Sequence, residues 1–263
     1  MKDVFRGFDR LGNIAIVKFS PSTKLKDKKK FANKILNENS SIRTILEKTG
    51  KFKGRLRKQE TKYILGEKTK EVLYKENNCV FRFNIDSTYF SSRLSNERKE
   101  IASKIKKNDD VLVMFSGVNP FGIVIAKQSM AKIVSVEINK EANKYAKLNV
   151  ELNKLKDNVE VIGGNIKRIA EKLKKEKRKF SVVVMPRPRL KESFLKQAFM
   201  VSKKNTKIYY YDFCKADEIS KIIEKIKAEA KKSRKKIKIL RKKFAGEIAP
   251  YNFRIRVDFM VLN

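Results

Sequence analysis

Hydrophobic and polar residues alternate with a two-residue period in several short stretches of the first part of the chain. Residues 13–19 (NIAIVKF) follow this pattern, which is typical of a strand with one buried face. Residues 63–73 and 80–85 predict further strands, whereas residues 25–47 are rich in lysine and space their large apolar side chains roughly as a helix does. We therefore predict a small, basic α+β domain over residues 1–90.

The pattern changes from about residue 96 onward. The apolar run at residues 111–115 (VLVMF) is typical of a parallel strand buried on both faces. Strands and helices then alternate as far as residue 232, which predicts a doubly wound sheet with right-handed crossovers. The further predicted elements are the strands 132–138, 158–163, 180–185 and 206–213 and the helices 140–153, 166–175, 190–202 and 216–232.

The end of the chain predicts an antiparallel connection. Residues 237–239 and 253–261 alternate apolar and polar side chains, and residues 246–252 lie between them as a turn. Parallel strands closed by such a hairpin form the α/β, Rossmann-like arrangement of class I methyltransferases, with seven strands in the sheet. A plain dinucleotide-binding Rossmann domain lacks the hairpin. We therefore predict a methyltransferase domain over residues 91–263.

Charge indicates the kind of partner. The 263 residues include 65 Lys and Arg against 29 Asp and Glu, a formal net charge of +36. A polyanion such as a nucleic acid would relieve the resulting self-repulsion. Residues 231–243 hold nine basic side chains and residues 24–30 hold five. For each run, a track for RNA phosphates and a merely solvated face remain open.

The composition also excludes several kinds of chemistry. The chain has no His and only two cysteines, Cys79 and Cys214, far apart in the sequence, which argues against a zinc site. Without His, acid–base chemistry has to use carboxylates, Lys, Tyr or the backbone. No apolar run approaches the ~20 residues that span a bilayer, and the N-terminus lacks the apolar core of a signal peptide. We expect a protein of the reducing cytoplasm.

Three strand ends carry candidate cofactor-binding residues, because ligands of doubly wound sheets bind at the carboxyl ends of the strands. The first strand runs into a loop with Gly117, whose spacing is not G-x-G-x-x-G. Glu137 ends the second strand, twenty residues later, where a carboxylate can accept both ribose hydroxyls. Asn165 follows the third strand and could contact an adenine amino group. An exposed acid at position 137 and a simple turn at position 165 are the alternatives.

Residues 89–98 (YFSSRLSNER) resemble the YFSPRL-x-x-ER signature of the archaeal and eukaryal tRNA guanine-37 N1-methyltransferases. The loop at residues 114–123 (MFSGVNPFGI) is similar to their cofactor loop, and further similarities extend over nearly the whole chain. The resemblance implies S-adenosyl-L-methionine as cofactor, the anticodon loop of a tRNA such as tRNA-Phe as partner, no metal, no membrane, and a monomer. Because the family's extra N-terminal domain has no counterpart here, we expect less strict inspection of distant parts of the tRNA.

The resemblance also implies roles for individual residues. Glu97 matches the general base that removes the guanine N1 proton, and Arg57 matches an Arg that stabilises charge on the guanine O6, with Arg55 as the alternative. Tyr89 matches an aromatic side chain that positions the base or the cofactor. Without the resemblance, Glu97 and Arg98 would be interpreted as a surface pair that opens a helix. The implied cofactor pocket is lined by Arg93, Phe115, Gly117, Val118, Glu137, Ile138, Gly164, Asn165, Pro186 and Pro188.

The sequence departs from the family pattern at four places. Pro186 stands where an Asn is expected, Val113 replaces an acidic residue, Asn119 stands where Gly is usual, and Asn165 replaces an Asp. A Pro in this motif is similar to a branch of archaeal enzymes that also methylate carbon 7 of the tricyclic wyosine precursor. Two other functions remain open: aminocarboxypropyl transfer in wyosine synthesis, and non-catalytic tRNA binding on a methyltransferase fold. Aromatic and basic residues interleave at residues 209–213 and 251–256, as expected for base stacking.

Overall fold

A computed structural model of the chain describes residues 7–50, 54 and 59–263. Arg57 and its alternative Arg55 lie outside the described residues. The chain divides into two compact units, Met1–Ser92 and Arg93–Asn263. Within the described ranges, no helix is long and apolar enough to cross a membrane.

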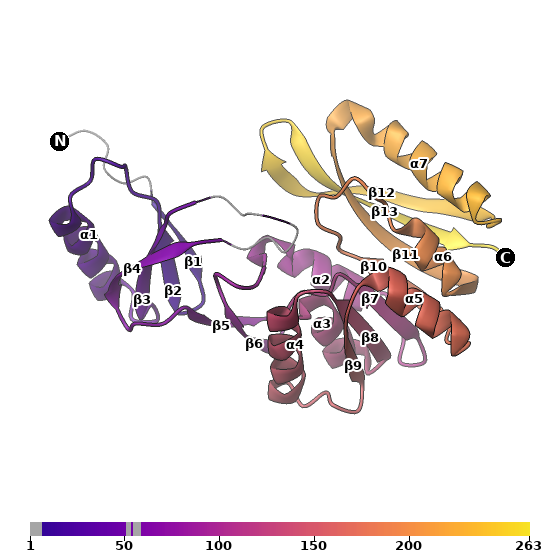
Figure 1. Cartoon of the computed structure of the whole chain (residues 1–263), viewed down its shortest axis with the longest axis horizontal. Helices are drawn as coiled ribbons and strands as arrows, with labels where there is room; N and C mark the ends of the chain where they lie inside the picture. The colour runs from indigo at the N-terminus through magenta and orange to yellow at the C-terminus, as the bar shows by residue number, and fades with distance from the viewer. Residues whose placement is uncertain (1–6, 51–53, 55–58) are drawn as a thin grey trace. The chain divides into compact units, whose positions relative to one another are not determined.

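The first unit contains a four-stranded sheet of order β1-β2-β3-β4 and a separate hairpin formed by β5 and β6 (Figure 1). Gly12, in the turn after β1, has a φ of +59°, and a Cβ there would lie 1.9 Å from the Leu73 carbonyl oxygen, so only glycine fits. The elements are β1 (Phe8–Leu11), β2 (Ile14–Val17), α1 (Leu25–Glu38), β3 (Thr44–Lys48), β4 (Thr61–Gly66), β5 (Glu71–Glu76) and β6 (Cys79–Asn84).

Two predictions for this unit need correction. The helical spacing assigned to residues 25–47 is wrong beyond Glu38, because Ile45 and Leu46 belong to β3 and are fully buried there. Lysines fill one side of α1, and its inner side packs Ala32 and Ile35 into the small core. Residues 63–73 form parts of two strands rather than one, since the chain turns between Gly66 and Glu71.

The second unit is a doubly wound sheet of order β12-β13-β11-β10-β7-β8-β9. Strands β7 to β10 are parallel, β11 is parallel to β10, and β13 is antiparallel to both β11 and β12. The elements are η1 (Ser92–Leu94), α2 (Ser95–Ala102), β7 (Asp110–Met114), α3 (Pro120–Ser129), β8 (Lys132–Glu137), α4 (Lys140–Leu152), β9 (Val159–Gly163), α5 (Ile166–Lys175), β10 (Phe180–Met185), α6 (Leu195–Met200), β11 (Ser202–Lys215), η2 (Ala216–Glu218), α7 (Ile219–Lys232), β12 (Ile237–Ala249) and β13 (Asn252–Val261).

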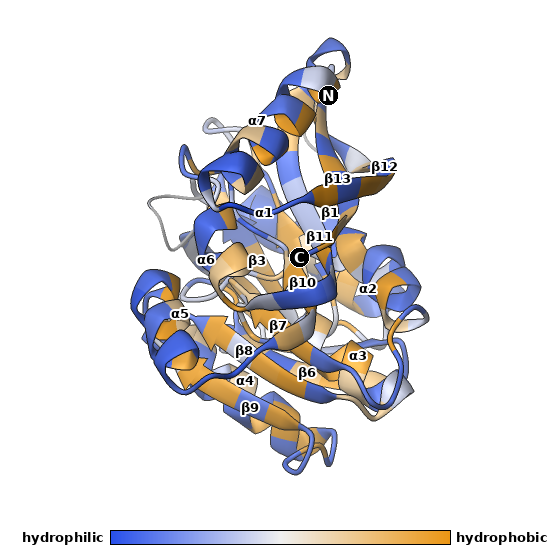
Figure 2. Ribbon diagram, turned by 90° about the vertical axis from the view of Figure 1, so that its right-hand side faces the viewer, coloured by the Kyte–Doolittle hydropathy of each residue, from blue (hydrophilic) through white to orange (hydrophobic). Residues whose placement is uncertain are grey.

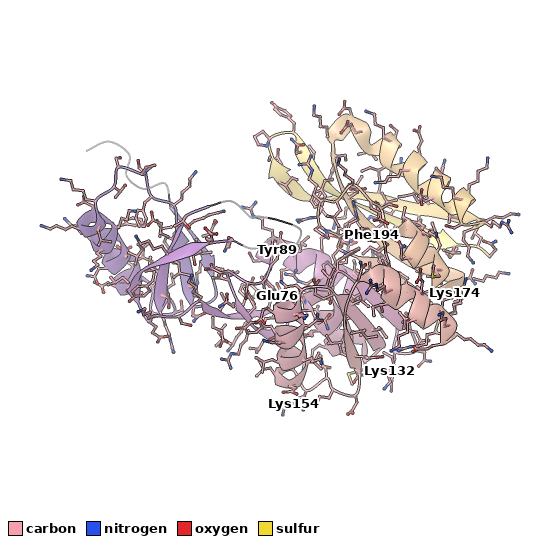
Figure 3. The ribbon with its side chains drawn as sticks, in the orientation of Figure 1. Glu76, Tyr89, Lys132, Lys154, Lys174 and Phe194 are labelled. Atoms are coloured by element: carbon pink, nitrogen blue, oxygen red, sulfur yellow. The ribbon has the colours of Figure 1, made fainter. Side chains whose placement is uncertain are left out.

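The sheet of the second unit is the middle layer. Helices α5, α6 and α7 pack their apolar residues against one face in a single large cluster, and α2 and α3 cover the other face. Figure 2 shows the hydrophobic residues concentrated on strands β7, β8 and β9, whereas the outward sides of the helices are hydrophilic. Lysines such as Lys154 and Lys174 project outward around this unit (Figure 3). The predicted fold class is therefore confirmed.

The closing hairpin is longer than the alternation indicates. Residues 246–252 are not a turn, because β12 continues to Ala249 and only Pro250 and Tyr251 connect it to β13. Gly246, with a φ of +116°, lies where the register shifts between Phe244 and Glu247, so it marks a bulge inside the strand. The predicted helix at residues 190–202 is likewise shorter, since α6 begins only at Leu195.

Candidate active site

The strand order reverses at β7, which has β8 on one side and β10 on the other. Loops that leave the carboxyl ends of such neighbouring strands separate and open a crevice. The loop after β7 is tightly wound: Phe115, Gly117 and Asn119 all have a φ near +60°. Its end is packed against Gly122, where a Cβ would lie 2.3 Å from the Asn119 side-chain oxygen. The sequence thus builds a compact turn at the crevice.

Glu137 is held at the tip of β8 by the backbone of this turn. Its carboxylate accepts hydrogen bonds from the N–H of Gly117 at 2.8 Å and from the N–H of Asn139 at 2.8 Å. The two contacts tie the tips of β7 and β8 together. Glu137 is therefore half-buried and tied to the backbone rather than an exposed acid at the strand end.

The tip of β9 adds the next predicted residues. Gly164 has a φ of +150° and donates its N–H to the Glu137 carbonyl oxygen at 2.8 Å. Ile138 and Gly164 line one surface pocket together with Asn143 and three lysines of α4. Asn165 caps α5 by accepting the N–H of Lys167 at 3.1 Å. The structure therefore brings these predicted residues to one edge of the sheet.

The loop after β10 is anchored by an arginine that the sequence analysis did not single out. Pro186 and Pro188 flank Arg187, whose side chain is buried and pairs with Asp212 of β11. The same guanidinium donates to the carbonyl oxygens of Leu190 and Glu192. This anchor fixes the two prolines at the crevice without using any side-chain donor of their own.

Glu97 is buried in the first turn of α2. The interpretation of Glu97 and Arg98 as a surface pair is wrong, because their exposed fractions are 5% and 1%. The Glu97 carboxylate accepts hydrogen bonds from the Tyr211 hydroxyl at 2.9 Å, from Lys243 at 2.5 Å and from Arg256 at 2.6 Å. A buried carboxylate requires such partners.

Arg256 is the centre of this cluster. Its side chain is fully buried and donates to Glu97, to Glu100 at 2.6 Å and to Asp258 at 2.7 Å. Burial raises the pKa of Glu100, but hydrogen bonds from Arg256, Lys104 and Lys243 lower it by more, so it lies well below the usual range. These ion pairs attach α2 to the β12–β13 hairpin.

Tyr211 connects the cluster to the cofactor loop. Its ring centroid lies 5.9 Å from that of Phe121, near the start of α3, while its hydroxyl donates to Glu97. Burial, and then the negative charge of Glu97, raise the pKa of Tyr211 well above its usual value, so the hydroxyl keeps its proton. Glu97 therefore lies on the same side of the sheet as α3, next to the carboxyl end of β10.

The remaining predicted residues are placed as follows. Val118 is fully buried, and its carbonyl accepts from Asn149 at 3.2 Å. Phe115 packs its ring edge-on against Phe194, with centroids 5.0 Å apart. Arg93 is exposed on η1, and Tyr89 is half-buried in the first unit.

Base stacking by the tyrosines of β11 is excluded. Tyr209, Tyr210 and Tyr211 are buried, and burial raises the pKa of Tyr209 to about 12. The sequence analysis did not predict the ion-pair cluster around Arg256, although β13 contains a signal for it. In this strand Arg256 and Asp258 alternate with fully buried apolar residues. Charges at that spacing share one covered face, so they had to pair with charges from elsewhere.

No group of three or more His, Cys, Asp or Glu side chains suited to a metal ion occurs among the residues that the structure describes. Both cysteines are free and buried, and burial raises the pKa of the Cys214 thiol.

This strand order, the glycine turn after β7 and the acidic tip of β8 together define a class I methyltransferase. Residues 72–240 match the TRM5/TYW2 methyltransferase domain, and residues 1–69 match the TYW2 N-terminal domain. The chain belongs to the TRM5/TYW2 methyltransferase family.

Individual relatives agree with this assignment. Taw22 from Nanoarchaeum equitans, a tRNA (guanine(37)-N(1))/4-demethylwyosine(37)-methyltransferase, is 31% identical over 302 aligned residues that cover 97% of this chain and 99% of that protein. The crystal structure of Trm5b from Pyrococcus abyssi covers 98% of this chain and 76% of its own, with a TM-score of 0.84 and 28% identity. The complex of aTrm5 with tRNALeu has a TM-score of 0.82 and 26% identity, covering 99% of this chain and 73% of its own.

These similarities confirm the predicted family and the enzyme class. The structure of Methanocaldococcus jannaschii Trm5 in complex with adenosine, 26% identical with a TM-score of 0.79, covers 99% of this chain and 76% of its own and agrees with the predicted S-adenosylmethionine cofactor. These similarities do not test the roles of individual residues, which stay predictions.

Proposed function

We propose that this enzyme transfers a methyl group from S-adenosylmethionine to the nucleoside at position 37 of a tRNA, with guanine N1 as the main acceptor. The observation that carries this proposal is the position of Glu97. Its buried carboxylate is connected through Tyr211 and Phe121 to the loop at the tip of β7. A proton acceptor and a cofactor crevice thus lie on the same part of the sheet.

The residues present fit the cofactor. The Glu137 carboxylate, held by two backbone N–H groups, is suited to ribose hydroxyls, and Gly117 and Gly164 leave room for close approach of a ligand. Ile138 offers an apolar surface to an adenine ring, and Asn165 offers an amide at its edge. When bound, S-adenosylmethionine supplies an electrophilic methyl group.

Glu97 is the proposed general base. Guanine N1 carries a proton that has to leave as the new bond to carbon forms, and its acidity rises steeply at that stage, so a carboxylate suffices as acceptor. Arg256 and Lys243 fix the position of the carboxylate from the protein side. Arg57 and Tyr89 are proposed, from the family resemblance, to stabilise charge on the guanine O6 and to position the base.

A second acceptor is favoured by one feature of the site. Pro186 cannot donate a hydrogen bond to a guanine, because it has neither a side-chain donor nor a backbone N–H. Arg187 holds that loop in place by its contacts to Asp212 and to two carbonyl groups. The apolar surface of two prolines suits a larger, tricyclic base, so methylation of carbon 7 of the wyosine precursor is proposed as an additional activity.

The test is methyl transfer to anticodon stem-loops of tRNA-Phe that carry either guanine or the tricyclic precursor at position 37, followed by nucleoside mass analysis. For Glu97→Gln, the single-turnover rate on guanine should fall about 100-fold or more, with unchanged cofactor affinity in calorimetry. Transfer of an aminocarboxypropyl mass by the unaltered enzyme would contradict the proposal.

Glu100→Gln is the matched control. Glu100 lies one turn further along α2 and shares Lys243 and Arg256 with Glu97, so its loss damages the same cluster. If Glu97 is the base, Glu100→Gln should retain most of the single-turnover rate. Equal losses in both variants would mean that Glu97 only supports the structure. We further propose that the enzyme works as a monomer in the cytoplasm, where its proposed substrate occurs.

A further inference from the structure

The β11–β13 part of the second unit extends beyond the parallel strands. Strand β10 pairs with β11 only as far as Met185 and Tyr210, while β11 continues to Lys215 and pairs with β13 up to Asn252. The five additional residues of β11 correspond to about 16 Å at roughly 3.3 Å per residue. The end of the hairpin therefore projects past the carboxyl end of β10 (Figure 1).

The hairpin end, formed by Phe244, Ile248, Tyr251 and Phe253, exposes a cluster of apolar side chains. Tyr251 is 80% exposed, Phe244 44% and Ile248 37%. The rings of Phe244 and Phe253 lie side by side, with centroids 4.8 Å apart. Such a concentration of exposed aromatic surface at one position indicates a binding surface rather than scattered surface residues.

The backbone at Tyr251 is strained as well. Its φ is +59°, in the left-handed region, which favours Gly or Asn, and Pro250 precedes it in a two-residue turn. The energetic cost of this backbone conformation is normally offset by packing of the side chain. The ring of Tyr251, however, is the most exposed large apolar side chain among the described residues. The exposed ring therefore adds little to the packing of the chain itself and is available to a molecule outside it.

The positive charge of the chain indicates which kind of molecule would bind the hairpin end. Of the basic residues of β12, Lys242 is exposed toward the hairpin end, whereas Arg241 and Lys243 pair with Glu100 and Lys238 lies at the other end of the strand. The chain carries a formal net charge of +36, so a second copy would be repelled, whereas an unpaired RNA segment offers phosphates for Lys242 and π-faces for the rings.

We propose that the hairpin end is a stacking platform for an unpaired nucleotide next to the one that is methylated. This inference rests on the proposed function, because it assigns the occupant to the same RNA loop. The platform would act in binding and positioning the RNA, since none of its side chains contacts Glu97 or Glu137 in the contacts of the described residues.

The test uses Tyr251→Gly, which removes the ring and suits the left-handed backbone, so Tm should not fall. Anisotropy of a labelled stem-loop should show roughly 10-fold weaker binding. A 2-aminopurine next to position 37 should be quenched by the unaltered enzyme and less by the variant. Tyr251→Phe, which keeps an aromatic ring, should bind the RNA and quench 2-aminopurine as the unaltered enzyme does. Leu240→Ala, which alters a 46% exposed residue of the same strand away from the turn, should change neither.

Two outcomes would overturn the inference. One is unchanged affinity and quenching in Tyr251→Gly while the unaltered enzyme methylates the stem-loop, in which case the proposed function stands. The other is a concentration-dependent dimer that Tyr251→Gly abolishes without changing RNA affinity. If the unaltered enzyme binds and quenches the RNA but transfers no methyl group, the platform is supported and the proposed function fails.

Discussion

The parallel and antiparallel halves of the seven-stranded sheet use different chemical groups to hold their functional side chains in place. In the parallel half, β7 to β10, the carboxyl edge is built from backbone N–H groups, glycines and small amides, as in the contacts of Glu137 with Gly117 and Asn139. In the antiparallel half, β11 to β13, one face carries a buried cluster of ionised side chains around Arg256.

This difference follows from what each half has to hold. Backbone donors at strand tips are fixed by the sheet itself, and they hold the Glu137 carboxylate that is proposed to bind the cofactor's ribose. The hairpin, by contrast, has to hold α2 and the Glu97 carboxylate at a set position, and charge-assisted hydrogen bonds fix geometry more strictly than apolar contacts do. Variants of the two halves should therefore differ in the size of their effects.

The largest effect is expected for Arg256→Met. It leaves Glu97, Glu100 and Asp258 without the guanidinium they share, at positions shielded from water, so the free energy of unfolding should fall by about 3–5 kcal/mol. Urea unfolding measures the change. Arg178→Met is the control, because Arg178 and Glu160 form a partly exposed pair and its loss should cost less than about 1 kcal/mol. Equal losses of unfolding free energy in the two variants would show that the buried cluster stabilises the fold no more than an exposed ion pair does.

Glu100→Gln should give a smaller loss that depends on pH. At neutral pH the loss of hydrogen bonds to charged donors should cost about 1.5–3 kcal/mol. The folded pKa of Glu100 is depressed, so its contribution is complete above the unfolded value near 4.5 and is lost as the pH falls below it. The stability difference between the two proteins should therefore be constant from about pH 7 to about pH 5 and shrink as the pH falls further to about 3. A difference that stays constant over the whole range would show that the carboxylate charge is not what stabilises the fold.

The smallest effect is expected in the parallel half. Asn165→Ala removes the cap of α5 and should lower the free energy of unfolding by about 1 kcal/mol. Asn165→Asp keeps a capping oxygen and adds a negative charge at a helix N-terminus, so stability should be retained. A charged acceptor for an adenine amino group should also tighten S-adenosylmethionine binding in calorimetry. Weaker cofactor binding by Asn165→Asp would contradict the assigned contact.

Sequence patterns located the parallel half accurately. The helix at residues 166–175 and the strand at residues 180–185 match α5 and β10 residue for residue, and Glu137 lies at a strand tip as predicted. Buried parallel strands appear as uninterrupted apolar runs, and amphipathic helices have an unambiguous period. The positions of Gly117, Glu137 and Asn165 at the strand tips could therefore be predicted without coordinates, while their roles in binding the cofactor stay predictions.

The sequence was less informative where two local patterns are compatible with one segment. Residues 44–47 continued the apparent helical spacing of α1 but belong to β3, since their partners in the sheet are distant in sequence. Gly246 resembled a turn residue but forms a bulge within β12. In both cases strand pairing overrode a local preference, as is common for β-structure.

The sequence by itself determined the order of elements, the doubly wound sheet, the basic character of the chain and the residues at the strand tips. These properties depend on local periodicity and on charge, which can be read along the chain. Only the tertiary structure decided that Glu97 is buried, that Arg256 is its partner 159 positions away, and that Tyr251 rather than the tyrosines of β11 is exposed. Those properties depend on which distant side chains exclude water from one another, and a linear pattern does not specify that.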